Sequence, residues 1–254
     1  MKAGETQSSW GSTFRGLIHM RISELATTAT LVRFTIAFVI VFGLTFLIGS
    51  KSDSPQFWNL ATYFFALGFL PFYCLVKGGE SLRSELKEGT IEFLWTRPVR
   101  RSSLFLGFYA SSLIGIGAFT TVCLVALSGA GLWLGEISSV GQIFMYCLGC
   151  LTIALSFSAL SLSCGSLTSK FVVIGILYYF FTEKLLAQVP TNARKVSIVA
   201  NLKPHFLANA EQSSEIVFTS AAHSILYVIA TAAIALILGG IAFTLKRYSL
   251  GDDK

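Results

Sequence analysis

The sequence predicts an all-α, polytopic membrane protein with six transmembrane helices. Hydrophobic residues make up 54% of the 254 residues and charged residues only 13%, whereas about a quarter of a soluble domain is charged. The charges are gathered into a few polar stretches, and the apolar stretches between them are long enough for crossings of about 20 residues each. No residues remain for a soluble domain, so residues 1–254 are interpreted as a single transmembrane domain.

Six apolar stretches qualify as membrane spans. The third is long enough to tilt strongly or to break, and the fifth is the weakest because it contains Glu183 and Lys184. Small residues within the spans, such as Gly149 and the Gly239-Gly240 pair, indicate close helix packing. The predicted spans are residues 31–49, 57–76, 103–134, 140–163, 168–188 and 221–245.

An amphipathic helix is predicted over residues 12–28, ahead of the first span. Its apolar residues recur at helical spacing, which favours a helix lying in the membrane interface over a solvated tail. Arg21 and Arg33 bracket this segment as membrane-surface anchors. The apolar residues are Phe14, Leu17, Ile18, Ile22 and Leu25.

The distribution of positive charge predicts the orientation. If both termini, residues 77–102 and residues 164–170 lie on one side, that side collects 14 of the 19 Lys and Arg residues. The positive-inside rule therefore places both termini and residues 77–102 in the cytoplasm. The formal net charge of +6 is read as topology and lipid head-group affinity, and no nucleic-acid partner is expected.

Residues 189–220 form the longest segment predicted outside the membrane. Its apolar patches fit short helices in the outer leaflet and a plain loop about equally well. Glu183 and Lys184 lie just before this segment. They are ionisable residues within the fifth predicted span, near the outer end of that span. We expect Glu183 to reach the head groups, which costs little at an interface. The alternative is that Glu183 pairs with Lys184 or Arg194 and gates an external exit.

Several classes of chemistry find no support in the sequence. There is no phosphate-binding G-x-x-x-x-G-K-[ST] motif, no carboxylate at the middle of a span and no internal repeat of the kind ion-coupled carriers use. The three histidines are scattered. Cys147 and Cys150 form a CxxC, but within a helix they are interpreted as small hydrophobes. We therefore expect no enzyme activity, no metal and no cofactor on this chain.

The most distinctive segment is the polar stretch at residues 80–101, between the second and third spans. Its composition favours a helix up to Glu88, and Gly89 can adopt the positive φ that ends one helix before another begins. Thr90 can cap the new helix, where Glu92 would lie near the positive end of the dipole. Pro98 stops this second helix.

These residues resemble a family, the ABC-2 type permeases, which are membrane subunits of ATP-binding-cassette exporters. The pattern is Glu85-x-x-x-Gly89-Thr90-Ile91-Glu92-x-Leu94-x-Thr96-Arg97-Pro98-Val99-x-Arg101, with Trp95 where many members carry leucine. The resemblance implies that residues 80–98 contain a cytoplasmic coupling helix that enters a cleft on the ATPase. Arg100 and Arg101, with the two arginines near the first span, would anchor the frame at the membrane surface. The residues expected to contact the ATPase are Glu85, Glu88, Gly89, Thr90, Ile91, Glu92, Leu94, Arg97 and Pro98.

The resemblance also implies the function and the partners. The chain would be a permease in the inner membrane of a prokaryote, paired with a second copy or a paralogue, and driven by a cytoplasmic ATPase that carries the ATP and Mg²⁺. The apolar, aromatic-rich spans favour a hydrophobic or amphiphilic exported substrate. Two alternatives are a membrane scaffold that transmits force from an ATPase without transport, and, less favoured, an ion-coupled carrier.

Overall fold

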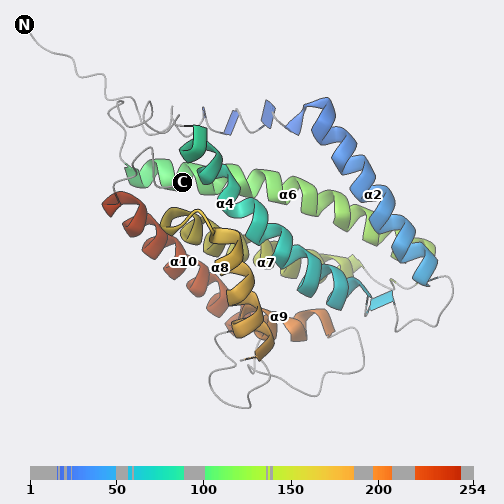
Figure 1. Ribbon diagram of the computed structural model, residues 1–254. Helices are drawn as coiled ribbons and strands as arrows, with labels where there is room; N and C mark the ends of the chain where they lie inside the picture. Colours follow the sequence, from blue (N-terminus) through green and yellow to red (C-terminus); the bar gives the residue numbers. More distant parts are fainter. Residues whose placement is uncertain are drawn as a thin grey trace, which may run out of the picture.

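The computed structural model shows a bundle of long helices (Figure 1). Helices dominate the described part of the chain, which contains no strand. The structure describes residues 16, 18–19, 22–23, 25–49, 57–58, 60–88, 101–135, 137, 140–185, 197–207 and 221–246.

Nine helical elements follow one another along the described residues, two of them with the wide turns of a π-helix (η1 and η2). They are α2 (Thr28–Gly49), η1 (Leu60–Phe69), α4 (Leu70–Glu88), α6 (Arg101–Trp133), α7 (Val140–Leu167), α8 (Phe171–Tyr178), η2 (Tyr179–Leu185), α9 (Ile198–Leu207) and α10 (Ala221–Leu245).

Five helices are long and apolar enough to cross a membrane: α2, η1 with α4, α6, α7 and α10. These correspond to five of the six predicted spans. The stretch predicted as the fifth span, residues 168–188, contains 8 residues of α8 followed by 7 residues of η2. That length is less than the roughly 20 residues of a full crossing.

The helices alternate in direction, so their ends gather at two ends of the bundle (Figure 1). We call the end where α4, α7 and α10 finish and where α6 and α8 begin the charged end. It carries cations that include Arg83, Arg101 and Lys246. At the opposite end, α9 packs beside η1, η2, α7 and α10.

Helix α7 lies at the centre of the bundle and makes its most extensive contacts with α4 and α10. On the α10 side, the Ser163 hydroxyl donates a hydrogen bond of 2.6 Å to the carbonyl of Ala235. A Cβ on Gly239 would stand 2.8 Å from the Ser163 Cα. The close packing that the Gly239-Gly240 pair predicted is therefore confirmed.

Helix α2 has the least covered surface of the long helices, and only 6% of its most apolar stretch is buried. It packs mainly on α6 and lies at the edge of the bundle, in blue in Figure 1. Phe38, Phe42 and Phe46 form a stacked ladder along it, with ring centroids 6.0 and 6.3 Å apart.

The end of α4 and the start of α2 refine the helix boundaries predicted from the sequence. The second span was predicted to end at residue 76, but α4 continues to Glu88, as the helix-forming composition of residues 80–88 indicated. For the predicted interfacial helix at 12–28, residues 16, 18, 19, 22, 23 and 25 are helical and α2 begins at Thr28. The other residues before Leu25 lie outside the described part.

Candidate functional site

The predicted coupling segment, residues 80–98, begins on the last turns of α4 at the charged end, and its residues after Glu88 lie outside the described part. Glu85 is half-buried on the last turns of α4, and Glu88 is the final residue of that helix. The remaining predicted ATPase contacts, and the predicted anchors Arg21 and Arg100, lie outside the described residues. These contacts are Gly89, Thr90, Ile91, Glu92, Leu94, Arg97 and Pro98.

The two helices that flank this segment are joined by a small core of their own, which we call the base cluster. Its side chains come from α4, α6, α7 and α10, and each is at most 2% exposed. The rings of Phe105 and Phe243 lie 5.7 Å apart. Because packed interiors resist deformation, the base cluster holds the ends of α4 and α6 in a defined relation. Its members are Leu82, Leu104, Phe105, Phe108, Leu162 and Phe243.

Cationic side chains bind helix carbonyls around the base cluster. The Arg83 Nε on α4 donates a 2.7 Å hydrogen bond to the Gly165 carbonyl, and the Lys246 ammonium donates one of 2.7 Å to the Leu167 carbonyl. Both carbonyls lie in the last turn of α7. The last carbonyls of a helix have no partner within it and form the negative end of its dipole. These cations therefore stabilise the end of α7.

Arg101 was predicted only as a membrane-surface anchor, but it also makes a contact within the protein. Its guanidinium is half-buried and donates a 3.2 Å hydrogen bond to the Thr244 carbonyl near the end of α10. The first residue of α6 is thus tied to the last turn of α10. Arg33, in contrast, is exposed on the second turn of α2.

Close backbone contact joins α4 to α7 just before the base cluster. A Cβ on Gly78 would stand 2.9 Å from the Ser158 Cα, and one on Gly79 would stand 2.6 Å from the Phe171 ring. The Ser161 hydroxyl accepts a 2.9 Å hydrogen bond from the Gly79 amide and donates one to the Leu75 carbonyl. Helix α4 is therefore packed tightly against α7. Sequence analysis missed this contact, although the Gly78-Gly79 pair is the small-residue signal that predicts it.

Glu183 requires a correction, because the expectation that it reaches the lipid head groups is wrong. Its side chain is only 2% exposed, and its carboxylate binds the start of α9. The Glu183 oxygens accept hydrogen bonds from the Ile198 amide (3.1 Å), the Val199 amide (2.8 Å) and the Ser197 hydroxyl (2.5 Å). The Tyr178 hydroxyl donates a longer one of 3.4 Å.

This arrangement satisfies the amides of the first turn of α9, which have no partner within the helix. Ser197 also accepts a 2.9 Å hydrogen bond from the Ala200 amide, which is the bond an N-cap serine makes. Lys184, the neighbour of Glu183, is exposed and lies 5.8 Å from the Tyr179 ring centroid. The signal for the cap was Ser197 directly before an apolar run, but nothing in the sequence pairs it with Glu183.

Residues 189–220 were predicted either to form short helices in the outer leaflet or to be a plain loop, and the described part of this segment contains helix α9. Residues 198–207 form a helix, but the helix packs into the protein core. Phe206 is 1% exposed and contacts the bare backbone of Gly149, where a Cβ would stand 2.6 Å from its ring. The Tyr146 ring lies 5.2 Å away, edge to face.

The described residues contain no group of three or more His, Cys, Asp or Glu side chains placed to hold a metal ion. Cys150 is fully buried on α7 and Cys147 is partly buried on the same helix. No protein-family model matches the sequence, and no curated protein matches it significantly.

Proposed function

We propose that the chain is the permease subunit of an ATP-binding-cassette transporter. In this proposal, residues 80–98 contact a separate cytoplasmic ATPase and transmit its conformational change to the membrane helices. The observation that carries the proposal is the sequence pattern that begins at Glu85 in the last turns of α4 and ends at Arg101, the first residue of α6. The ATPase supplies ATP and Mg²⁺, and two permease chains assemble side by side in the membrane. With residues 168–188 as the fifth crossing, the chain spans the membrane six times.

The packing of the helices that flank this segment supports the proposal. The segment can transmit a displacement only if the flanking helices are held rigidly, and the base cluster joins the ends of α4 and α6. From there, two connections carry displacement into the bundle. The contact of Gly78 and Gly79 with α7 couples α4 to the central helix, and the bond from Arg101 to the Thr244 carbonyl couples α6 to α10.

In the proposed cycle, ATP binding closes the ATPase subunits and displaces the coupling segment. Rigid-body motion of packed helices then opens a pathway between two permease chains, as in other domain rearrangements. The exposed apolar surface of α2 is available for lipid or for the second permease chain. A hydrophobic or amphiphilic molecule is the proposed cargo, moved outward.

Charge reversal at the coupling segment tests the proposal. The full-length chain is expressed in its native host with an affinity tag, and the co-purifying ATPase is identified by mass spectrometry. Glu92→Arg should abolish both its recovery and the stimulation of its activity, because charge reversal at a desolvated contact costs several kcal/mol. Glu215→Arg, which changes the same charge in the segment predicted to be external, is the matched control.

Wild-type recovery and stimulation in Glu92→Arg, with both variants inserted equally in the membrane, would refute the coupling role. ATP-dependent flux of a fluorescent amphiphile in vesicles separates a transporter from a force-transmitting scaffold. The scaffold would retain ATPase stimulation that depends on Glu92 but show no flux.

A further inference from the structure

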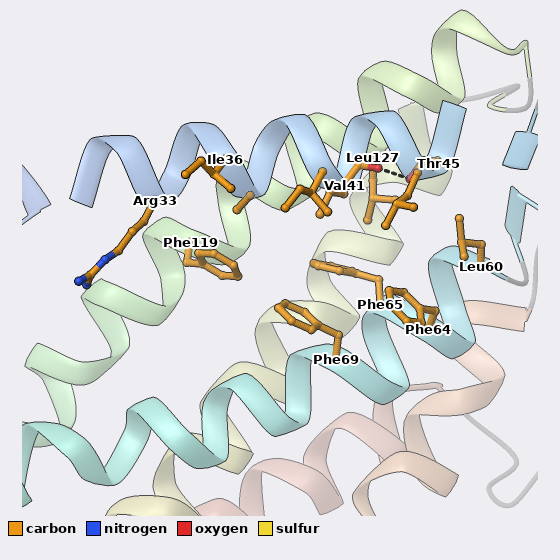
Figure 2. Close-up of a pocket in the computed structure, with 13 residues that line it drawn as sticks. Arg33, Ile36, Val41, Thr45, Leu60, Phe64, Phe65, Phe69, Phe119 and Leu127 are labelled. Atoms are coloured by element: carbon orange, nitrogen blue, oxygen red, sulfur yellow. Dashed lines mark hydrogen bonds between the residues drawn. The ribbon is translucent and has the colours of Figure 1, made fainter. Parts of the chain in front are cut away.

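A groove runs between α2, η1 and α6. The inference about its occupant does not rest on the proposed function. The groove has a volume of about 590 Å³ and is lined almost entirely by apolar side chains. Figure 2 shows Phe65 and Phe69 of η1 extending into the space beside α2, with Phe119 of α6 nearby. The volume is that of a small-molecule site.

Polarity changes abruptly at one end of this groove. Arg33 and Phe119 line both the apolar groove and a second, polar cavity of about 490 Å³. That second cavity lies toward the charged end. Besides Arg33, its polar lining comprises Thr27, Thr30, Tyr73, Lys77, Glu80, Ser81 and Ser84.

Among the described residues that line this junction, the net charge is positive. Lys77 and Glu80 neutralise one another in an ion pair of 2.5 Å, which leaves the guanidinium of Arg33. Among the described residues, no acidic side chain forms an ion pair with Arg33, and Figure 2 shows it extending away from the apolar side chains. An anion is the charge-complementary ligand here, and arginine binds phosphate through a planar fork of donors.

The length of the groove matches one leaflet of a bilayer. Arg33 and Thr45 both line it and are twelve residues apart on α2, which is about 18 Å along a helix axis. Half of the hydrocarbon thickness of a membrane is about 15 Å. A molecule with a phosphate at Arg33 and an acyl chain reaching Thr45 would therefore fit the groove from end to end.

We propose that this groove binds one anionic phospholipid of the leaflet at the charged end. Its head-group phosphate contacts Arg33 beside the polar cavity, and one acyl chain lies against Ile40, Phe65 and Phe69. The lipid covers the face of α2 turned toward η1 and fills the gap between them. A helix of a second copy would fit the apolar part but would leave the arginine without an anion.

Photocrosslinking in nanodiscs tests the proposal. The full-length chain is reconstituted in phosphatidylcholine with a small fraction of phosphatidylglycerol that carries a diazirine on its acyl chain, and the crosslinked peptides are mapped. Crosslinks should concentrate on residues 36–45 and 60–69. The same diazirine on phosphatidylcholine, at equal fraction, should label these residues several-fold less.

Two matched pairs of variants distinguish binding from general lipid contact. Arg33→Gln should reduce the crosslinking about fivefold, the factor that one basic residue contributes near anionic lipid, whereas Lys170→Gln, an exposed cation at the same end, should not. Ile40→Trp fills the groove and should also reduce it. Val39→Trp, on the same helix but not lining the groove, should not.

Arg33→Gln and Ile40→Trp act on different parts of the groove, so each tests the proposal if the other fails to yield a monodisperse helical protein. Labelling that is even over all lipid-exposed helices, or that is unchanged in the folded variants, would overturn the proposal. Loss of labelling as the chain dimerises would assign the groove to a second copy and would also overturn it.

Discussion

The two ends of the bundle satisfy helix termini with charges of opposite sign. At the charged end, Arg83 and Lys246 donate to the last carbonyls of α7. At the opposite end, the carboxylate of Glu183 accepts from the first amides of α9. Both follow the direction of the helix dipole, which is positive at the start and negative at the end of a helix.

The difference between the two ends lies in burial. The Arg83 side chain is half-buried and Lys246 partly exposed, so water replaces part of any contact that is removed. Glu183 is buried with all its described partners close by. Losing a buried acceptor leaves donors without partners, which costs more than the net value of a hydrogen bond. The backbone amides at the start of α9 therefore depend mainly on one carboxylate, whereas the charged end distributes its helix-end contacts over several cations.

The largest effect is expected from Glu183→Gln. The amide keeps one acceptor oxygen but turns an NH₂ group toward backbone N–H donors, so we expect a loss of about 2–4 kcal/mol in the free energy of unfolding. Hydrogen exchange should rise in residues 198–207, measured by mass spectrometry in detergent. The control, Lys184→Gln, changes an exposed neighbour and should cost at most about 0.5–1 kcal/mol. Equal exchange in both variants would mean that α9 is held by packing alone.

A smaller effect is expected from Gly79→Ala, which tests whether close packing holds the charged end. The added Cβ would stand 2.6 Å from the Phe171 ring and 2.9 Å from the Ser161 carbonyl oxygen. Overpacking of this kind costs about 1–3 kcal/mol, visible as a lower thermal unfolding temperature. Gly117→Ala is the control, because a Cβ there meets nothing within 4 Å. A loss of stability in the control, or none in Gly79→Ala, would contradict this picture of the α4–α7 contact.

The smallest effect is expected from Arg83→Gln. It removes the 2.7 Å bond to the Gly165 carbonyl and should lower the unfolding free energy by about 1 kcal/mol, since the other cations of this end remain. The comparison is Lys77→Gln, which breaks an exposed ion pair and should cost less than about 0.5 kcal/mol. If Arg83→Gln destabilises as much as Glu183→Gln, the proposed contrast between the two ends is wrong.

Much of the helical architecture was predictable because it rests on local patterns. Five of the six predicted spans appear as helices long enough to cross a membrane, and the glycines at 149 and 239 mark real close contacts. The interior of the coupling segment stays a prediction, because residues 89–100 lie outside the described part. The base cluster that holds the flanking helices was harder to predict, since Leu82, Phe105 and Phe243 come from helices far apart in the chain.

The sequence by itself determined the helical fold class and five of the long helices of this protein. Hydrophobicity summed over about 20 residues and the placement of polar breaks are local properties. Tertiary structure alone decided what each buried polar group does. In the sequence, Glu183 has the pattern of a charge at the membrane interface. In the folded chain, the backbone amides of residues 198 and 199 lie against its carboxylate and bind it. The physical reason is that the cost of burying a charge depends on partners that the fold supplies from a distance.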